Sequence, residues 1–237
     1  MVYIVSRTFD ACKATANELN ATGPGQCIPL QADLSSEEAC QTFAETIAKH
    51  ESHVDVLINN SAIGLETPVE TTSANAWNET LSLNVTSTYL LTRFLLPLLD
   101  AAATSPNGAR VINIGSIGGF MPQKISTIAY DTSKAAVHHM TRVLAAKLAR
   151  RPNGGHILVN AIAPGVIPTK MTEGIPYVTG KSFEKLKEEV PTERLGEDAD
   201  MAGLAIFLSS KASGWISGQV ITCDGGMVGT AETGVGP

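Results

Sequence analysis

The sequence is poor in charged and aromatic residues. Only 17% of its 237 residues are charged and 5% are aromatic, whereas 43% are hydrophobic. Proteins that bind nucleic acids carry a clustered surplus of Lys and Arg, but this chain has a formal net charge of −6. We therefore expect no nucleic-acid partner. Abundant aliphatic residues with few aromatic ones are typical of parallel sheets covered by helices.

The chain also lacks a paired cysteine motif and a long apolar segment. Its four cysteines are scattered and form no Cys-x-x-Cys pair: Cys12, Cys27, Cys40 and Cys223. We therefore expect no metal site. The most apolar stretch, residues 89–103, is interrupted by Arg93 and Asp100 and is too short to span a bilayer. Without a signal peptide, we expect reduced thiols, a cytoplasmic protein and no membrane partner.

Short apolar runs alternate with helix-length stretches, without repeats or linkers. The strand-length runs are residues 2–5, 54–58, 111–114, 157–163 and 220–222. The expected helices are residues 10–20, 36–50, 77–103, 133–150 and 199–209, with Ser36 as a capping residue. This alternation predicts one α/β domain, residues 1–237, with a doubly wound parallel sheet. Ligands bind such sheets at the carboxyl ends of the strands.

Tyr130 and Lys134 are the pair with the clearest chemistry. Residues four apart lie on one face of a helix. A lysine ammonium beside a phenol favours the phenolate, so we expect a Tyr130 pKa below its usual value of about 10. Such a phenol exchanges protons near neutral pH, as carbonyl reduction and alcohol oxidation require. Ser116, at the end of an expected strand, would hold the substrate oxygen by a hydrogen bond.

Seven segments, in order, resemble the short-chain dehydrogenase/reductase family over nearly the whole chain. They are residues 2–7, 32–34, 55–62, 83–85, 111–116, 160–165 and 216–226. The resemblance implies a Rossmann-like fold and an oxidoreductase that interconverts a ketone and a secondary alcohol. Within the family, residues 96–99, 110–116 and 162–165 look most like the β-ketoacyl reductases related to rhamnolipid synthesis, which implies secondary metabolism.

The same resemblance implies a role for each matching residue. The catalytic residues would be Asn84, Ser116, Tyr130 and Lys134. The cofactor-binding residues would be Arg7, Asp33, Leu34, Asn60, Tyr130, Lys134, Pro164, Gly165, Ile167 and Thr169. Asn84 would hold a water on the proton path to Lys134, or it could simply hydrogen-bond neighbouring backbone. Ser61 and Ala62 depart from the Ala-Gly of the family, and the methyl group of Ala62 would crowd the cofactor.

The position of Arg7 indicates which of the two nicotinamide cofactors, NADP or NAD, is expected. It follows the segment that resembles the second strand of the family, where a guanidinium would contact the 2′-phosphate of NADP. We therefore expect NADP(H), with NAD(H) as the alternative.

One element of the family is missing from the sequence. The family opens with a strand and a Gly-x-x-x-Gly-x-Gly turn, where backbone amides at a helix N-terminus hold the cofactor pyrophosphate. This chain starts in the segment that resembles the second strand, and residues 6–12 contain no glycine. We therefore expect a sheet missing the first βα unit, with unpaired backbone groups on both sides of the absent strand.

Three explanations of this absence stay open. The sequence could be a shortened form of a longer enzyme, a short protein in which residues 2–6 move to close the sheet, or a chain that does not fold stably alone. If the shortening is real and uncompensated, we expect no nicotinamide cofactor. The protein would then be a redox-neutral isomerase or dehydratase, or a partner subunit of a complete homologue.

The remaining expectations concern substrate and assembly. Residues 168–195, with two glycines, two prolines and a charged run, look like a mobile substrate lid with room for a 3-oxoacyl thioester or a polyketide ketone. Residues 77–103 and 133–150 match helices that the family uses for assembly, so we expect a homodimer or homotetramer. His138 and His139 are assigned no role, since histidines there are more often packing or interface residues.

Overall fold

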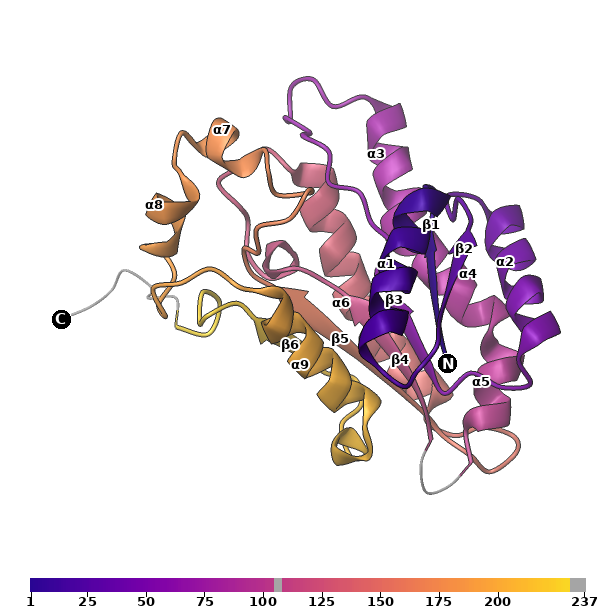
Figure 1. Cartoon of the computed structure of the whole chain (residues 1–237). Coiled ribbons are helices and arrows are strands. Elements are labelled where there is room, and N and C mark those ends of the chain that lie inside the picture. The colour runs from indigo at the N-terminus through magenta and orange to yellow at the C-terminus, as the bar shows by residue number, and fades with distance from the viewer. Residues whose placement is uncertain (105–107, 231–237) are drawn as a thin grey trace.

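Two parallel sheets form the centre of the molecule (Figure 1). The computed structural model describes residues 1–104 and 108–230. One sheet pairs β1 (Val2–Ser6) with β2 (Cys27–Gln31). The other has the order β3 (Val56–Asn59), β4 (Ala109–Ile114), β5 (Ile157–Pro164), β6 (Val220–Cys223). Every ladder is parallel, as the alternation of strands and helices predicts.

Helices connect the strands and flank both sheets (Figure 1). They are α1 (Phe9–Thr22), α2 (Glu37–His50), α3 (Ala74–Leu81), α4 (Ser87–Phe94), α5 (Leu96–Ala102), α6 (Ile128–Leu148), α7 (Ile175–Thr179), α8 (Phe183–Lys187) and α9 (Asp198–Ser209). The expected cap of α2 is confirmed: the Oγ of Ser36 accepts a hydrogen bond from the amide of Ala39 at 3.2 Å.

The prediction of one continuous helix over residues 77–103 is wrong. The segment contains a π-helical turn at Ser82–Thr86 and a break at Leu95, after which α5 begins. Pro97 causes the break, because proline has no amide hydrogen to donate within a helix but fits the first helical turn. The helix expected at 133–150 begins earlier, at Ile128, so Tyr130 and Lys134 lie on the same helix, α6.

The alternation of side chains along β4 and β5 divides the core between two layers. Val111 and Val159 face α2, α5 and α6. Ile112 and Ile162 face the opposite way, against Leu208 of α9. All four strand residues are at most 1% exposed. A parallel sheet covered on both faces needs apolar residues at successive positions, which explains the continuous apolar runs of these strands.

The two sheets are not joined by a backbone ladder. All five residues of β1 pair with β2, and no described strand lies between β1 and β3. β1 therefore does not move to pair with β3 and close the sheet. The edge of β3 is partly open, since Ile58 is 44% exposed. A hydrophobic cluster around Leu34, Cys40 and Leu91 connects the two halves instead.

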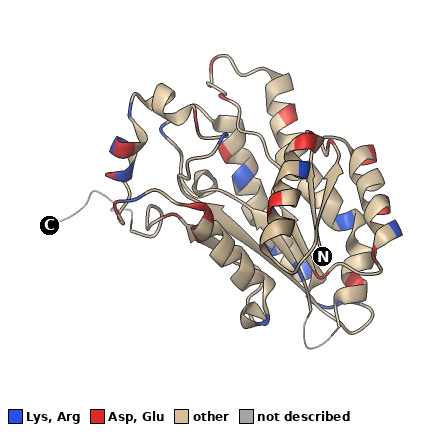
Figure 2. Ribbon diagram, in the orientation of Figure 1, with Lys and Arg blue, Asp and Glu red and all other residues tan. Residues whose placement is uncertain are grey.

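Charged residues lie mainly on the outer helices and loops, with both signs interspersed (Figure 2). The strands are largely free of charge in the same view. Within the described ranges, no helix is long and apolar enough to cross a membrane. The same residues contain no cluster of three His, Cys, Asp or Glu side chains that could hold a metal ion.

A substitution at Gly155, which lies just before β5, can test the packing at the amino-terminal end of that strand. A Cβ at this position would overlap the carbonyl oxygen of Ala103, which accepts a hydrogen bond from His156. Gly155→Ala is expected to lower the free energy of unfolding by about 2 kcal/mol, since overpacking forces the backbone to shift. Urea denaturation measures the change.

The matched control is Gly203→Ala in α9, where a Cβ would meet no atom within 4 Å. This change should raise the free energy of unfolding by roughly 0.5–1 kcal/mol, because glycine weakens a helix interior. Equal effects of the two substitutions would contradict the packing described.

Candidate active site

A cavity of about 570 Å³ opens at the carboxyl ends of the strands. The parallel register places the carboxyl-terminal parts of β3, β4 and β5 side by side, with Asn59 opposite Asn113 and Ile114 opposite Ile162. The residues that follow these strands therefore meet at one edge, as is general for parallel α/β sheets.

The cavity brings together nearly all of the residues predicted from the sequence. Those that line it are Arg7, Asp33, Leu34, Asn60, Ser116, Tyr130, Lys134, Pro164, Gly165, Ile167 and Thr169. Ser61 and Ala62, which depart from the motif of the family, line it as well. Asn84 is the predicted site residue that is absent from the lining.

Asn84 lies behind the cavity, in the π-helical turn that precedes α4. Its side chain is 2% exposed and fully engaged. The amide nitrogen donates to the carbonyl of Ile63 at 2.9 Å and to the Oγ of Ser133 at 3.0 Å. Its oxygen accepts from the amide of Ile63 at 2.9 Å. The side chain thus fastens the segment after β3 to α6, which matches the alternative that it hydrogen-bonds neighbouring backbone.

Ser116 and Tyr130 are neighbours in the lining of the cavity. Ser116 caps a short 3-10 turn after β4, and its Oγ accepts a hydrogen bond from the amide of Gly118 at 3.1 Å. Burial raises the pKa of Tyr130 above its ordinary value, while a hydrogen bond with the Ser116 hydroxyl lowers it and Asp131 raises it. The expected depression of the Tyr130 pKa is therefore not seen, because loss of hydration outweighs the favourable contacts.

Lys134 is a buried ammonium with a single acceptor. It is 3% exposed, and its Nζ donates to the carbonyl of Ile114 at 2.8 Å. Nζ also lies 5.4 Å from the centre of the Tyr130 ring. Burial lowers the pKa of Lys134 to about 8. An ammonium carries three donors, so two remain for a ligand in the cavity.

Arg7 and Asp33 line the end of the cavity formed by the two-stranded sheet. The guanidinium of Arg7 is exposed and has no ion pair or hydrogen bond within the described residues. Asp33 accepts a hydrogen bond from the amide of Ser35 at 3.1 Å. Leu34 is 4% exposed and packs in the core, so only its backbone is available to a ligand.

These groups fit the two ends of a nicotinamide nucleotide. The free donors of Lys134 suit a ribose hydroxyl, and the free guanidinium of Arg7 suits a phosphate. The middle of the site differs, because the lining contains no glycine turn at a helix N-terminus to hold the pyrophosphate. The N-terminus of α9 instead contributes Asp198, an acidic residue.

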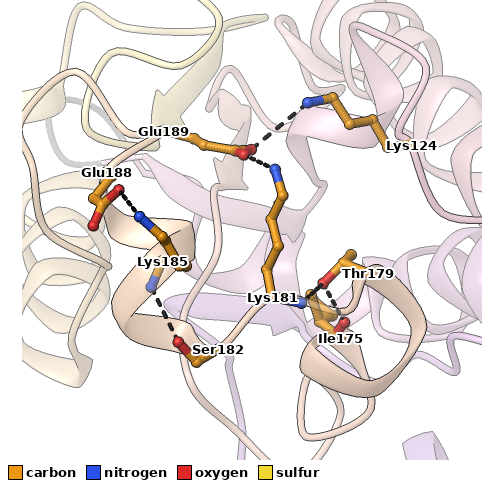
Figure 3. Close-up of polar contacts among 8 residues, drawn as sticks. All are labelled: Lys124, Ile175, Thr179, Lys181, Ser182, Lys185, Glu188 and Glu189. Atoms are coloured by element: carbon orange, nitrogen blue, oxygen red, sulfur yellow. Dashed lines mark hydrogen bonds and ion pairs between the residues drawn. The ribbon is translucent and has the colours of Figure 1, made fainter.

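The expected lid, residues 168–195, contains α7 and α8. Its first part contributes Thr169, Met171 and Thr172 to the cavity lining. Figure 3 shows Lys124 and Lys181 directed at the carboxylate of Glu189. Lys124 belongs to the loop before α6, and its Nζ lies 3.7 Å from the carboxylate. This ion pair connects the lid to the segment that precedes Tyr130.

Several lining residues were not predicted from the sequence. Met171, Thr172, Met201, Leu83 and Val5 border the cavity. Met171 also lies near Gly64, where an added Cβ would come 3.8 Å from its side chain and 3.7 Å from that of Tyr130. No local pattern distinguishes these residues, since their approach to the site depends on how the loops and helices pack.

A family model described as enoyl-(acyl carrier protein) reductase matches residues 1–228. The chain is 39% identical to the rhamnolipids biosynthesis 3-oxoacyl-[acyl-carrier-protein] reductase of Pseudomonas aeruginosa over 225 residues, which cover 95% of this chain and 85% of the relative. It is 34% identical to a short-chain dehydrogenase/reductase of Diaporthe leptostromiformis over 249 residues, covering 95% and 82%.

Solved structures show the same likeness. A Pseudomonas aeruginosa RhlG/NADP active-site complex matches with a TM-score of 0.87 and 38% identity, covering 95% of this chain and 86% of the other. A putative NAD(P)-dependent gluconate 5-dehydrogenase from Beutenbergia cavernae matches with a TM-score of 0.84 and 32% identity, covering 95% and 86%.

The buried ammonium of Lys134 should destabilise the folded protein at neutral pH. Between the folded pKa of about 8 and the usual value of 10.5, the unfolded chain binds the proton and the folded chain does not. The free energy of unfolding therefore rises with pH across this window and is lower below it. Lys134→Met is expected to stabilise the protein at pH 7 by about 2 kcal/mol and to flatten this pH dependence.

Lys147→Met, at an exposed position of the same helix, is the control and should leave the pH dependence unchanged. Denaturant unfolding between pH 7 and pH 11 measures both variants. An unaltered pH dependence in Lys134→Met would contradict the assignment.

Proposed function

The chain belongs to the short-chain dehydrogenase/reductase family and is an oxidoreductase of that type, and we propose that it interconverts a ketone and a secondary alcohol with NADP(H). One observation carries the proposal: Ser116, Tyr130 and Lys134 line the same cavity as the free guanidinium of Arg7. Proton-transfer groups and a phosphate-binding cation are thus combined in one site.

Ser116 and Tyr130 would hold the oxygen of the substrate. Their hydroxyl groups are close enough for the Ser116 hydroxyl to lower the pKa of Tyr130 by hydrogen bonding. A carbonyl oxygen placed between the two hydroxyls accepts from both, which fixes the orientation of the carbonyl carbon. When bound, a reduced nicotinamide supplies the hydride for that carbon.

Tyr130 is the proton donor in the direction of reduction. Burial keeps its pKa above the ordinary value, so the phenol is protonated at neutral pH and can give its proton to the alkoxide that develops on the substrate. Lys134 stands behind the phenol with its Nζ 5.4 Å from the ring centre. Its ammonium stabilises the phenolate that this transfer leaves, and it would hold a ribose hydroxyl of a bound nucleotide.

A 3-oxoacyl thioester or a polyketide-like ketone of secondary metabolism is the substrate class that we propose. The named activity of the Pseudomonas aeruginosa relative is 3-oxoacyl-[acyl-carrier-protein] reduction, and so is that of an Aquifex aeolicus relative with 31% identity over 226 residues. The cavity of about 570 Å³, bordered by residues of the lid segment 168–195, supports a substrate larger than a simple ketone. These reductase relatives do not favour the redox-neutral alternative.

Two other features support the proposed assembly and location. Tyr89 of α4 and Val143 of α6 are apolar and more than 40% exposed, which supports a homodimer or homotetramer through these helices. All four cysteines are free, which suits a reducing compartment, the cytoplasm.

NADPH titration of the folded 237-residue protein tests the proposal. We expect micromolar binding by calorimetry, followed by turnover of a 3-oxoacyl thioester. Tyr130→Phe should lower kcat by about 10²- to 10⁴-fold, since it removes the proton donor. Tyr177→Phe, which alters a phenol 92% exposed on α7, is the control and should keep full activity. Absence of binding at millimolar NADPH would refute the nicotinamide-dependent function.

Arg7→Ala tests the cofactor preference. If the guanidinium contacts the 2′-phosphate, its loss should weaken NADPH binding by about 10- to 100-fold, as expected for a charge-assisted hydrogen bond. NADH binding should not change. Arg150→Ala, at an exposed position after α6, is the control. If Arg7→Ala weakened the binding of NADPH and NADH equally, Arg7 would not contact the 2′-phosphate.

A further inference from the structure

Helix α6 holds the end of β4 through a row of buried polar side chains. Lys134 donates to the carbonyl of Ile114 at 2.8 Å, and Thr141 accepts from the side chain of Asn113 at 2.9 Å. Both side chains on α6 are at most 3% exposed. His138 lies between them on the same face of the helix and is 2% exposed. The row therefore reaches beyond the strand to the segment that carries Ser116.

The His138 ring fits a socket made by that segment. Its Nε2 accepts a hydrogen bond from the amide of Ser116 at 3.4 Å. A Cβ at Gly115 would collide with the ring, and a Cβ at Gly119 would lie 2.6 Å from its Cε1. The ring of Phe120 lies 4.5 Å away, centre to centre. The ring therefore touches this segment before, at and after Ser116.

The imidazole of His138 is neutral. Burial, above all, lowers the pKa of His138 to about 4, and the charges of Arg142 and Lys134 act in the same direction. A neutral ring that accepts at Nε2 carries its proton on Nδ1. This Nδ1 is buried and has no hydrogen-bond partner among the residues described. The Gly119 carbonyl favours a protonated ring but makes no regular hydrogen bond with Nδ1.

Packing alone does not account for a histidine in this socket. A phenylalanine ring of similar shape would fill the space without the unpaired Nδ1–H of His138, and an unpaired buried donor destabilises the folded state. What phenylalanine cannot supply is the acceptor at Nε2. The feature that distinguishes His138 is therefore its contact with the amide of Ser116.

We propose that His138 is a positioning residue for catalysis: its Nε2 holds the amide of Ser116 and so directs the Ser116 hydroxyl toward Tyr130. Ser116 has an extended backbone, with φ −168° and ψ 155°. Because Oγ follows the backbone of its own residue, fixing the amide restricts where the hydroxyl lies. The inference rests on the proposed function, in which Ser116 and Tyr130 bind the substrate oxygen.

The first experiment needs no turnover. Amide hydrogen exchange of the whole chain is followed by NMR in the wild type, His138→Phe and His138→Gln. His138→Phe should speed exchange of the Ser116 amide by about tenfold or more, as loss of one hydrogen bond predicts. His138→Gln places an acceptor near the position of Nε2 and should restore most of the protection.

The Gly115 amide, which donates to the carbonyl of Ile162 at 2.6 Å, is the internal control and should not change. An unchanged Ser116 rate in His138→Phe, or equal acceleration at Gly115, would overturn the proposal, because the ring would then act only by packing.

The second experiment measures turnover of a 3-oxoacyl thioester with NADPH. His138→Phe should lower kcat by roughly 10- to 100-fold, as expected when a reacting group is misplaced. NADPH affinity should not fall, and His138→Gln should recover activity. In Ser116→Ala, adding His138→Phe should have little further effect, since both changes act through one hydroxyl.

Independent, multiplying effects of the two substitutions would refute a role through Ser116. If the wild type shows no turnover at all, the proposed function fails, whereas the exchange experiment still decides whether His138 holds the amide of Ser116.

Discussion

The parallel register of β3, β4 and β5 is the constraint on which the site depends. Pairing of Asn59 with Asn113 and of Ile114 with Ile162 brings the carboxyl-terminal parts of the three strands to one edge of the sheet. Because side chains alternate along a strand, a shift of one residue would exchange the core face with the opposite face. Ile112 and Ile162 would then leave α9, and the segments that carry Asn60 and Ser116 would no longer border one cavity.

Burial sets the acid–base character of the catalytic groups. It raises the pKa of Tyr130 and lowers that of Lys134, because in both cases it disfavours the charged form. The protein interior thus keeps the Tyr130 phenol protonated and brings the pKa of Lys134 closer to neutral pH. Polar contacts act in addition to burial. The Ser116 hydroxyl favours the phenolate form of Tyr130. His138 in turn accepts a hydrogen bond from the amide of Ser116.

The site is assembled from two sheets that no backbone ladder connects. Arg7 and Asp33 follow the two-stranded sheet, whereas Ser116 follows the four-stranded one. Apolar packing of Leu34 and Cys40 against Leu91 holds these halves together. Packing of this kind is less directional than a hydrogen-bonded ladder, so the distance across the cavity depends on side-chain volume rather than on strand register.

The sequence by itself determined the α/β class, most strand positions and the candidate site residues that line the cavity, because these depend on local periodicity and on short motifs. It could not place the π-helical turn at Ser82–Thr86 or the side chain of Asn84 behind the cavity. It also predicted a lowered Tyr130 pKa, which the structure shows to be raised. Only the tertiary structure decided these points and the contact of His138 with Ser116, because burial and long-range hydrogen bonds arise from packing between distant segments.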